Sequence, residues 1–148
     1  MVTEVKAPAR AGHVDLFLAG GIMGVGDWQQ TAIELLADVD IVAANPRRAE
    51  PFQRSFQEDQ VAWEHKHLKA AETVLFWFPP ETLCPITLFE LGVFTMRPDT
   101  PIFVGTHPDY QRRIDVEIQL GIARPEVVVR NTLEDVVADV AAYWSKRS

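Results

Sequence analysis

Five short apolar runs alternate with five helical patterns along almost the whole chain, and this alternation restricts the fold more than any other feature. The runs are apolar on both faces, as the strands of a buried parallel sheet are. They cover Val14–Ala19, Asp40–Ala44, Thr73–Phe78, Pro101–Gly105 and Glu126–Arg130. The helical patterns cover Trp28–Val39, Gln57–Ala71, Pro85–Met96, Tyr110–Leu120 and Thr132–Ser145.

Strand and helix units in this order predict an α/β fold, in which a parallel sheet carries helices on both faces. Because crossover connections are right-handed, we expect a flavodoxin-like three-layer fold with a five-stranded parallel sheet. A chain of 148 residues is long enough for one such domain and too short for two ordinary ones. We expect residues 1–12 to form a flexible N-terminal tail and residues 13–148 to form the domain.

The composition limits the partners of the chain. A net charge of −7 argues against a nucleic-acid partner, because a protein that binds the phosphate backbone needs a basic face. No apolar run approaches the roughly 20 residues of a membrane helix, so we expect no membrane partner. The single cysteine, Cys84, excludes an intrachain disulfide and a thiolate metal cage, which fits a reducing, cytoplasmic location.

Parallel α/β sheets bind ligands outside the carboxyl ends of their strands. The loops at that edge are expected at Gly20–Asp27, Asn45–Phe56, Pro79–Cys84 and Thr106–Asp109. In the first of them, Gly20 and Gly21 either let backbone N–H groups approach an anion or a sugar, or only permit a tight turn. The glycine spacing is neither a dinucleotide fingerprint nor a phosphate P-loop.

One glutamate, Glu90, lies between Phe89 and Leu91 in an otherwise apolar helical pattern. An ionised carboxylate in such surroundings is costly unless partners satisfy it, so we expect its pKa to be raised. Such a group can act as a nucleophile or as a general acid. The structural alternative is a buried glutamate that caps a neighbouring loop.

The helical pattern before it places Gln60, Glu64 and His67 on one face, which is either part of a pocket beside Trp63 or a solvated surface. Glu64 and His67 have the spacing of metal ligands, but no further residue completes a ligand set, so we expect no metal. Two carboxylates at one cleft, Glu64 and Glu90, are the arrangement that glycosyl transfer uses.

Four segments together resemble the nucleoside 2-deoxyribosyltransferase-like family, from about His13 to Gln119. They are Leu16–Ile22 followed by Trp28 and Gln29, Asn45–Arg48, Gln60–Glu64, and Pro85–Gly92 with its Glu-Leu-Gly ending. The resemblance implies a flavodoxin-like fold and no cofactor. It also implies a homo-oligomer, a dimer or higher, in which a neighbouring chain closes the site.

The resemblance further implies 2-deoxyribosyl transfer between nucleobases through a covalent sugar ester on Glu90. Glu64 stands where the family has an acid that contacts and protonates the base. We expect the small-molecule nucleoside or nucleotide to be bound by Gly20, Gly21, Trp28, Asn45, Arg47, Gln60, Trp63 and Thr87. Trp28 or Trp63 would stack on the base, and an inward-facing Arg47 or Arg48 would favour a 5′-phosphate.

The chain departs from the family pattern at three places. Phe17 replaces a tyrosine that steadies the nucleophile, Cys84 replaces an aspartate, and Ala142–Ser145 lacks the asparagine that a neighbour supplies. The alternatives are therefore a nucleoside or nucleotide N-glycoside hydrolase and a non-catalytic nucleotide-binding module. A flavodoxin-type electron carrier is disfavoured, because the loop after the first predicted strand lacks a Ser/Thr-rich phosphate cradle.

Overall fold

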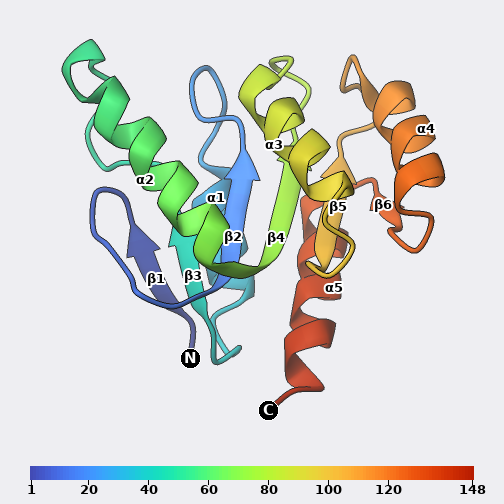
Figure 1. The fold of residues 1–148 in the computed structure, drawn as a ribbon, viewed down its shortest axis with the longest axis horizontal. Helices are drawn as coiled ribbons and strands as arrows, with labels where there is room; N and C mark the ends of the chain where they lie inside the picture. Colours follow the sequence, from blue (N-terminus) through green and yellow to red (C-terminus); the bar gives the residue numbers. More distant parts are fainter.

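The computed structural model describes residues 1–148 and contains one parallel sheet between two layers of helices (Figure 1). The sheet has the strand order β1-β3-β2-β4-β5-β6, and every neighbouring pair is parallel. Its strands are β1 (Thr3–Lys6), β2 (Val14–Gly20), β3 (Val42–Asn45), β4 (Ala71–Phe78), β5 (Ile102–Thr106) and β6 (Val129–Arg130). Without β1 this is the flavodoxin-like order, so the predicted fold class is confirmed.

The helices divide between the two faces of the sheet, as Figure 1 shows. They are α1 (Trp28–Leu35), α2 (Gln57–Ala70), α3 (Pro85–Thr95), α4 (Arg113–Ala123) and α5 (Leu133–Ser145), with a short 3₁₀ helix, η1, at Arg54–Phe56. The core under α2, α3 and α4 contains Phe17 and Phe76, whereas the core under α1 and α5 contains Leu16 and Leu75. Neighbouring residues of one strand thus face opposite cores, which explains why these strands are apolar throughout.

The prediction of five strands is wrong by one, because the sheet has six. The additional strand, β1, lies within residues 1–12 and pairs with β3 in the register Val5↔Ala44. Its sequence, Thr3-Glu4-Val5-Lys6, is short and mixed in polarity because β1 is an edge strand that is only partly buried. Its composition does not resemble that of a buried strand, so the apolar pattern could not reveal it.

The other predicted elements all occur, with differences mainly at their ends. Helix α4 begins at Arg113 instead of Tyr110, because the backbone before it forms turns, in which the Tyr110 N–H donates to the His107 carbonyl oxygen at 2.9 Å and the Arg113 N–H to that of Tyr110 at 3.1 Å. Strand β6 is reduced to Val129–Arg130. None of the helices has the length and the continuous apolar sequence needed to cross a membrane.

Candidate active site

A cavity of about 1270 Å³ lies between α2 and α3 and reaches the glycine-rich loop after β2. Pockets for small molecules commonly measure about 300–1,000 Å³, so this space is large enough for a nucleoside or a nucleotide. The predicted site residues that line it are Gly20, Gly21, Arg47, Gln60, Glu64, Thr87 and Glu90. The structure thus brings both carboxylates and five of the eight expected binding residues to one space.

Glu90 lies in the second turn of α3 and is half-buried against the cavity. Burial raises its pKa from the ordinary value of 4.5 to about 8, and the negative charge of Glu64 adds to the rise. No side-chain hydrogen bond stabilises its ionised form. At neutral pH Glu90 therefore keeps its proton.

Glu64 faces the same cavity from α2 and has partners that Glu90 lacks. Burial raises the pKa of Glu64, but the Gln60 side chain donates to its Oε2 at 2.8 Å and opposes the rise. The charge of Arg48 acts in the same direction as Gln60. The two carboxyl groups therefore form a coupled pair in which Glu64 is the better stabilised anion.

The start of α3 fixes the position of Glu90. Pro85 occupies the first turn, where a missing N–H costs nothing, and Cys84 precedes it in the left-handed conformation with φ of 50°. The Cys84 backbone N–H donates to Thr82 Oγ1 at 3.0 Å, which holds this bend. Burial raises the pKa of the Cys84 thiol, so it stays neutral beside the carboxylate pair.

Two residues that depart from the family pattern, Phe17 and Cys84, both line the cavity. Phe17 is 1% exposed and its ring lies 6.1 Å from that of Trp63. Neither side chain donates a hydrogen bond to Glu90. This wall of the cavity is thus apolar, which is consistent with the raised pKa of Glu90.

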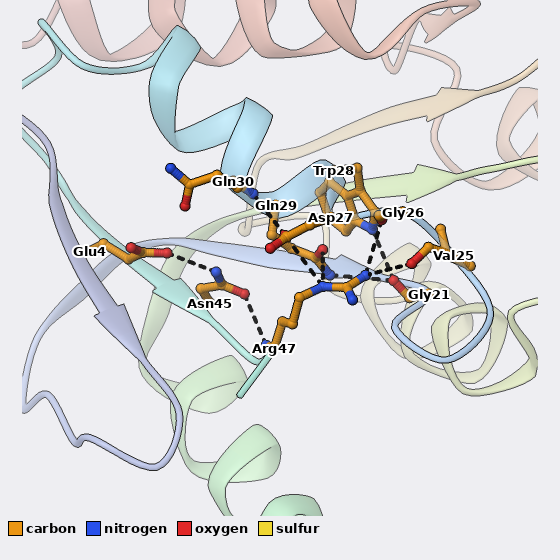
Figure 2. A network of polar contacts seen from close by, with 10 residues as sticks. All are labelled: Glu4, Gly21, Val25, Gly26, Asp27, Trp28, Gln29, Gln30, Asn45 and Arg47. Atoms are coloured by element: carbon orange, nitrogen blue, oxygen red, sulfur yellow. Dashed lines mark hydrogen bonds and ion pairs between the residues drawn. The ribbon is translucent and has the colours of Figure 1, made fainter. Parts of the chain in front are cut away.

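Three expected binding residues, Trp28, Asn45 and Arg47, belong to a polar network that holds the glycine-rich loop (Figure 2). Arg47 Nε donates to Gln29 Oε1 at 2.9 Å, and its Nη2 donates to the carbonyl oxygens of Val25 and Gly26. Arg47 Nε also lies 3.3 Å from Asp27 Oδ1, so the partners of the Arg47 guanidinium are residues of the glycine-rich loop and the start of α1.

Trp28 and Asn45 are buried and do not line the cavity. Trp28 Nε1 donates to the Gly21 carbonyl oxygen at 2.9 Å, and a Cβ atom on Gly20 would lie 2.3 Å from the Trp28 ring. Gly20 is therefore required for the close approach of this indole. Asn45 Nδ2 donates to Glu4 at 2.7 Å, so its amide links β3 to β1 (Figure 2).

Trp63 is also buried and offers no face to the cavity. Its ring stacks on His67 with the centroids 4.0 Å apart, and its Nε1 donates to the Ala9 carbonyl oxygen at 2.6 Å. His67 is fully buried, accepts from the Ala11 backbone N–H and contacts the Trp63 carbonyl oxygen through Nδ1. Both residues serve the packing of α2 against the N-terminal segment.

The aromatic residues that do line the cavity are phenylalanines, namely Phe17, Phe52, Phe56, Phe89 and Phe94. Sequence reasoning missed Phe52 and Phe56 as site residues. The only available signal was the pair of large apolar residues in a long polar loop at the carboxyl edge. It also missed Gln29, which is completely buried and connects α1 to Arg47.

The comparison with known families agrees with this geometry. Residues 13–110 match the family model described as nucleoside 2-deoxyribosyltransferase like, a span that contains the glycine-rich loop and both carboxylates. No curated protein matches the chain. Because the family model covers well over half of the sequence, the chain belongs to the nucleoside 2-deoxyribosyltransferase-like family, and this membership indicates N-glycosidic chemistry on nucleosides.

Proposed function

We propose that this protein breaks the N-glycosidic bond of a 2-deoxyribonucleoside or its nucleotide and transfers the sugar to a second base. The observation that carries the proposal is the pair of facing carboxyl groups, Glu90 on α3 and Glu64 on α2, in one cavity. Retaining glycosidases use two carboxyl groups in this way, one as nucleophile and one as acid.

In the first step an ionised Glu90 oxygen attacks the anomeric carbon C1′ and forms an ester. The C1′–N bond breaks, its electron pair leaves with the base, and Glu64 donates a proton to the departing base nitrogen. In the second step a nitrogen of another base attacks C1′, the ester bond breaks, and Glu64 takes back the proton. Water in place of the second base would make the same protein a hydrolase.

This reaction requires the proton shared by the two carboxyl groups to move from Glu90 to Glu64. The raised pKa of Glu90 keeps the proton there, whereas attack requires it on the Glu64 side. A base that contacts Glu64 supplies an acceptor for that proton. The reactive form is thus the pair with one proton, because the doubly ionised pair has no acid and the doubly protonated pair has no nucleophile.

Mass spectrometry of the intact protein tests the proposal directly. The protein is mixed with 2-deoxyribonucleosides, ribonucleosides and their 5′-monophosphates, and base release is followed in parallel. We expect a sugar adduct that maps to Glu90, its absence in Glu90→Gln, and a kcat lowered by about 10²–10⁴-fold in Glu64→Gln. Added second base should yield a new nucleoside in preference to free sugar.

The matched control is Glu58→Gln, which removes an exposed carboxylate from α2 outside the cavity and should leave turnover unchanged. Full base release by Glu90→Gln would disprove the role of this residue. Nucleotide binding without base release would instead support a non-catalytic binding module. Free sugar as the sole product would identify a hydrolase.

A further inference from the structure

Arg48, the neighbour of Arg47, also lines the cavity but has a different environment, because its guanidinium makes a single hydrogen bond. Its side chain is only 10% exposed. Nε donates to Gln60 Oε1 at 2.6 Å, and the guanidinium carbon lies 4.4 Å from the centroid of the Phe56 ring. The terminal nitrogens make no hydrogen bond, and the nearest carboxylate, half-exposed Glu50, is 3.9 Å from Nη1.

The terminal nitrogens of Arg48 are not fully enclosed. No fully buried side-chain nitrogen or oxygen in the protein lacks a hydrogen-bond partner, so Nη1 and Nη2, which make no hydrogen bond, keep some exposed surface, and the residue itself is part of the cavity lining. The hydrogen bond to Gln60 and the stacking on Phe56 fix the orientation of the Arg48 guanidinium. A guanidinium held in this way presents parallel donors at little further entropic cost.

Two hydrogen bonds connect the Arg48 guanidinium to Glu64, the proposed acid. Gln60 accepts from Arg48 through Oε1 and donates to Glu64 through Nε2, so a single amide separates the guanidinium from the Glu64 carboxylate. The charge of Arg48 also opposes the rise in the pKa of Glu64. Because the proposed function assigns Glu64 to the leaving base, Arg48 lies on the base side of the cavity.

We propose that Arg48 is a specificity-determining residue that selects a base edge with two adjacent acceptors, and so favours 6-oxopurines over 6-aminopurines. The inference rests on the proposed function for the position of the base. Guanine and hypoxanthine present O6 and N7, which accept both arms of a guanidinium. Adenine presents N7 beside the N6 amino donor, which would face a donor of Arg48 and leave one of its N–H groups unpaired.

A 5′-phosphate is the other group that a free guanidinium binds well. The connection to Glu64 through Gln60 favours the base, because the proposed function places the base next to Glu64, whereas the 5′-phosphate is attached through C4′ and not through C1′, which carries the base. The two assignments differ in what a change at Arg48 alters: base discrimination in one case, and the preference for monophosphates over nucleosides in the other.

The test compares 2′-deoxyinosine with 2′-deoxyadenosine, and free hypoxanthine with free adenine, in the wild type, Arg48→Lys and Arg48→Gln. We expect the wild type to favour deoxyinosine in kcat/KM by about 10- to 100-fold. Arg48→Lys keeps the charge but loses the paired donors of the guanidinium, so the ratio of kcat/KM for deoxyinosine to that for deoxyadenosine should fall toward one. Arg54→Lys is the matched control, because Arg54 is exposed on η1 outside this cavity and the ratio should persist.

Calorimetry with the free bases separates this inference from the proposed function, because it requires no turnover. Tighter binding of hypoxanthine that is lost in Arg48→Lys supports the inference even if no nucleoside is cleaved, in which case only the proposed function fails. Equal binding of both bases by the wild type overturns the inference. The inference is also overturned if Arg48→Lys leaves the ratio of kcat/KM for deoxyinosine and deoxyadenosine unchanged. It is likewise overturned if Arg48→Lys lowers activity only on 5′-monophosphates.

Discussion

Among the individual residues, Glu90 has the environment least suited to its own ionised form. Its carboxyl group is half-buried, lacks a hydrogen-bond donor, and faces a second carboxylate in Glu64. Ionising Glu90 in the folded protein is therefore unfavourable. A residue of this kind lowers the stability of the fold at a site where the proposed chemistry needs a carboxylate.

The raised pKa of Glu90 predicts that the protein loses stability as the pH increases. Between about pH 5 and pH 8 the folded protein keeps a proton on Glu90, whose pKa is about 8, while the unfolded chain releases it near pH 4.5. Since the folded state binds more protons, the free energy of unfolding falls with rising pH, by at most about 1.4 kcal/mol per unit from this group. Urea denaturation at a series of pH values measures the slope.

Glu90→Gln removes this titration without changing the shape of the side chain. Its free energy of unfolding should equal that of the wild type near pH 5 and exceed it increasingly toward pH 8. A smaller slope should remain, because burial also raises the pKa of Glu64. Parallel stability curves for Glu90→Gln and the wild type would contradict the assignment, and the exposed Glu58→Gln variant should follow the wild type throughout.

Among the elements, the glycine-rich loop between β2 and α1 depends on supports from other parts of the chain. Arg47, just after β3, donates to the carbonyl oxygens of Val25 and Gly26, and Trp28 donates to that of Gly21 (Figure 2). These donors satisfy backbone groups that would otherwise require water. The loop thus has a defined shape although glycines allow many others.

We predict that Arg47→Met loosens this loop and lowers stability. Hydrogen bonds from a charged donor contribute about 1.5–3 kcal/mol each, and Arg47 donates through two nitrogens, Nε and Nη2, so their loss should cost about 3–6 kcal/mol in the free energy of unfolding. The KM for the nucleoside should rise more than kcat falls, because the loop lines the cavity but carries no reacting group. Thermal denaturation and steady-state kinetics measure the two effects.

The matched change is Arg54→Met, which removes an exposed arginine of η1 that makes no ion pair. It should alter the free energy of unfolding by no more than about 0.5 kcal/mol. Arg47→Met with the stability and KM of the wild type would show that the loop keeps its shape without this network.

In the whole molecule, the N-terminal segment completes both the sheet and the packing of α2. Strand β1 pairs with β3 along its length, the Ala9 carbonyl oxygen accepts from Trp63, and the Ala11 N–H donates to His67. The segment therefore supports the helix that carries Glu64. In Figure 1 it crosses from the β1 edge of the sheet, beneath α2, to the start of β2.

Removal of residues 1–10 should destabilise the protein and reduce its activity. It exposes the edge of β3 and leaves the buried Trp63 Nε1 without its acceptor, which at about 1 kcal/mol per lost hydrogen bond predicts a loss of roughly 3–5 kcal/mol. Urea denaturation followed by tryptophan fluorescence measures it. Removal of residues 146–148, which are exposed after α5, should leave the midpoint unchanged, and an equal midpoint for both truncations would refute the role of β1.

The sequence by itself determined the α/β alternation, the flavodoxin-like order and the position of Glu90 at the carboxyl edge of the sheet. The alternation and the position of Glu90 are local properties, because a strand buried on both faces is apolar along its own length and a carboxylate stands out in an apolar helix. The strand order follows from that alternation because crossover connections are right-handed. The edge strand β1 escaped prediction because its burial depends on β3, which follows it by more than thirty residues.

Only the tertiary structure decided what the polar residues of the site contact. Arg47 and Arg48 are identical neighbours in the sequence, yet Arg47 binds the glycine-rich loop, whereas Arg48 donates to Gln60 on α2 and stacks on Phe56. Trp28 and Trp63, both suited to stacking on a base, are instead packed in the two cores. The direction and partners of a side chain depend on residues distant in the sequence, and no local pattern contains that information.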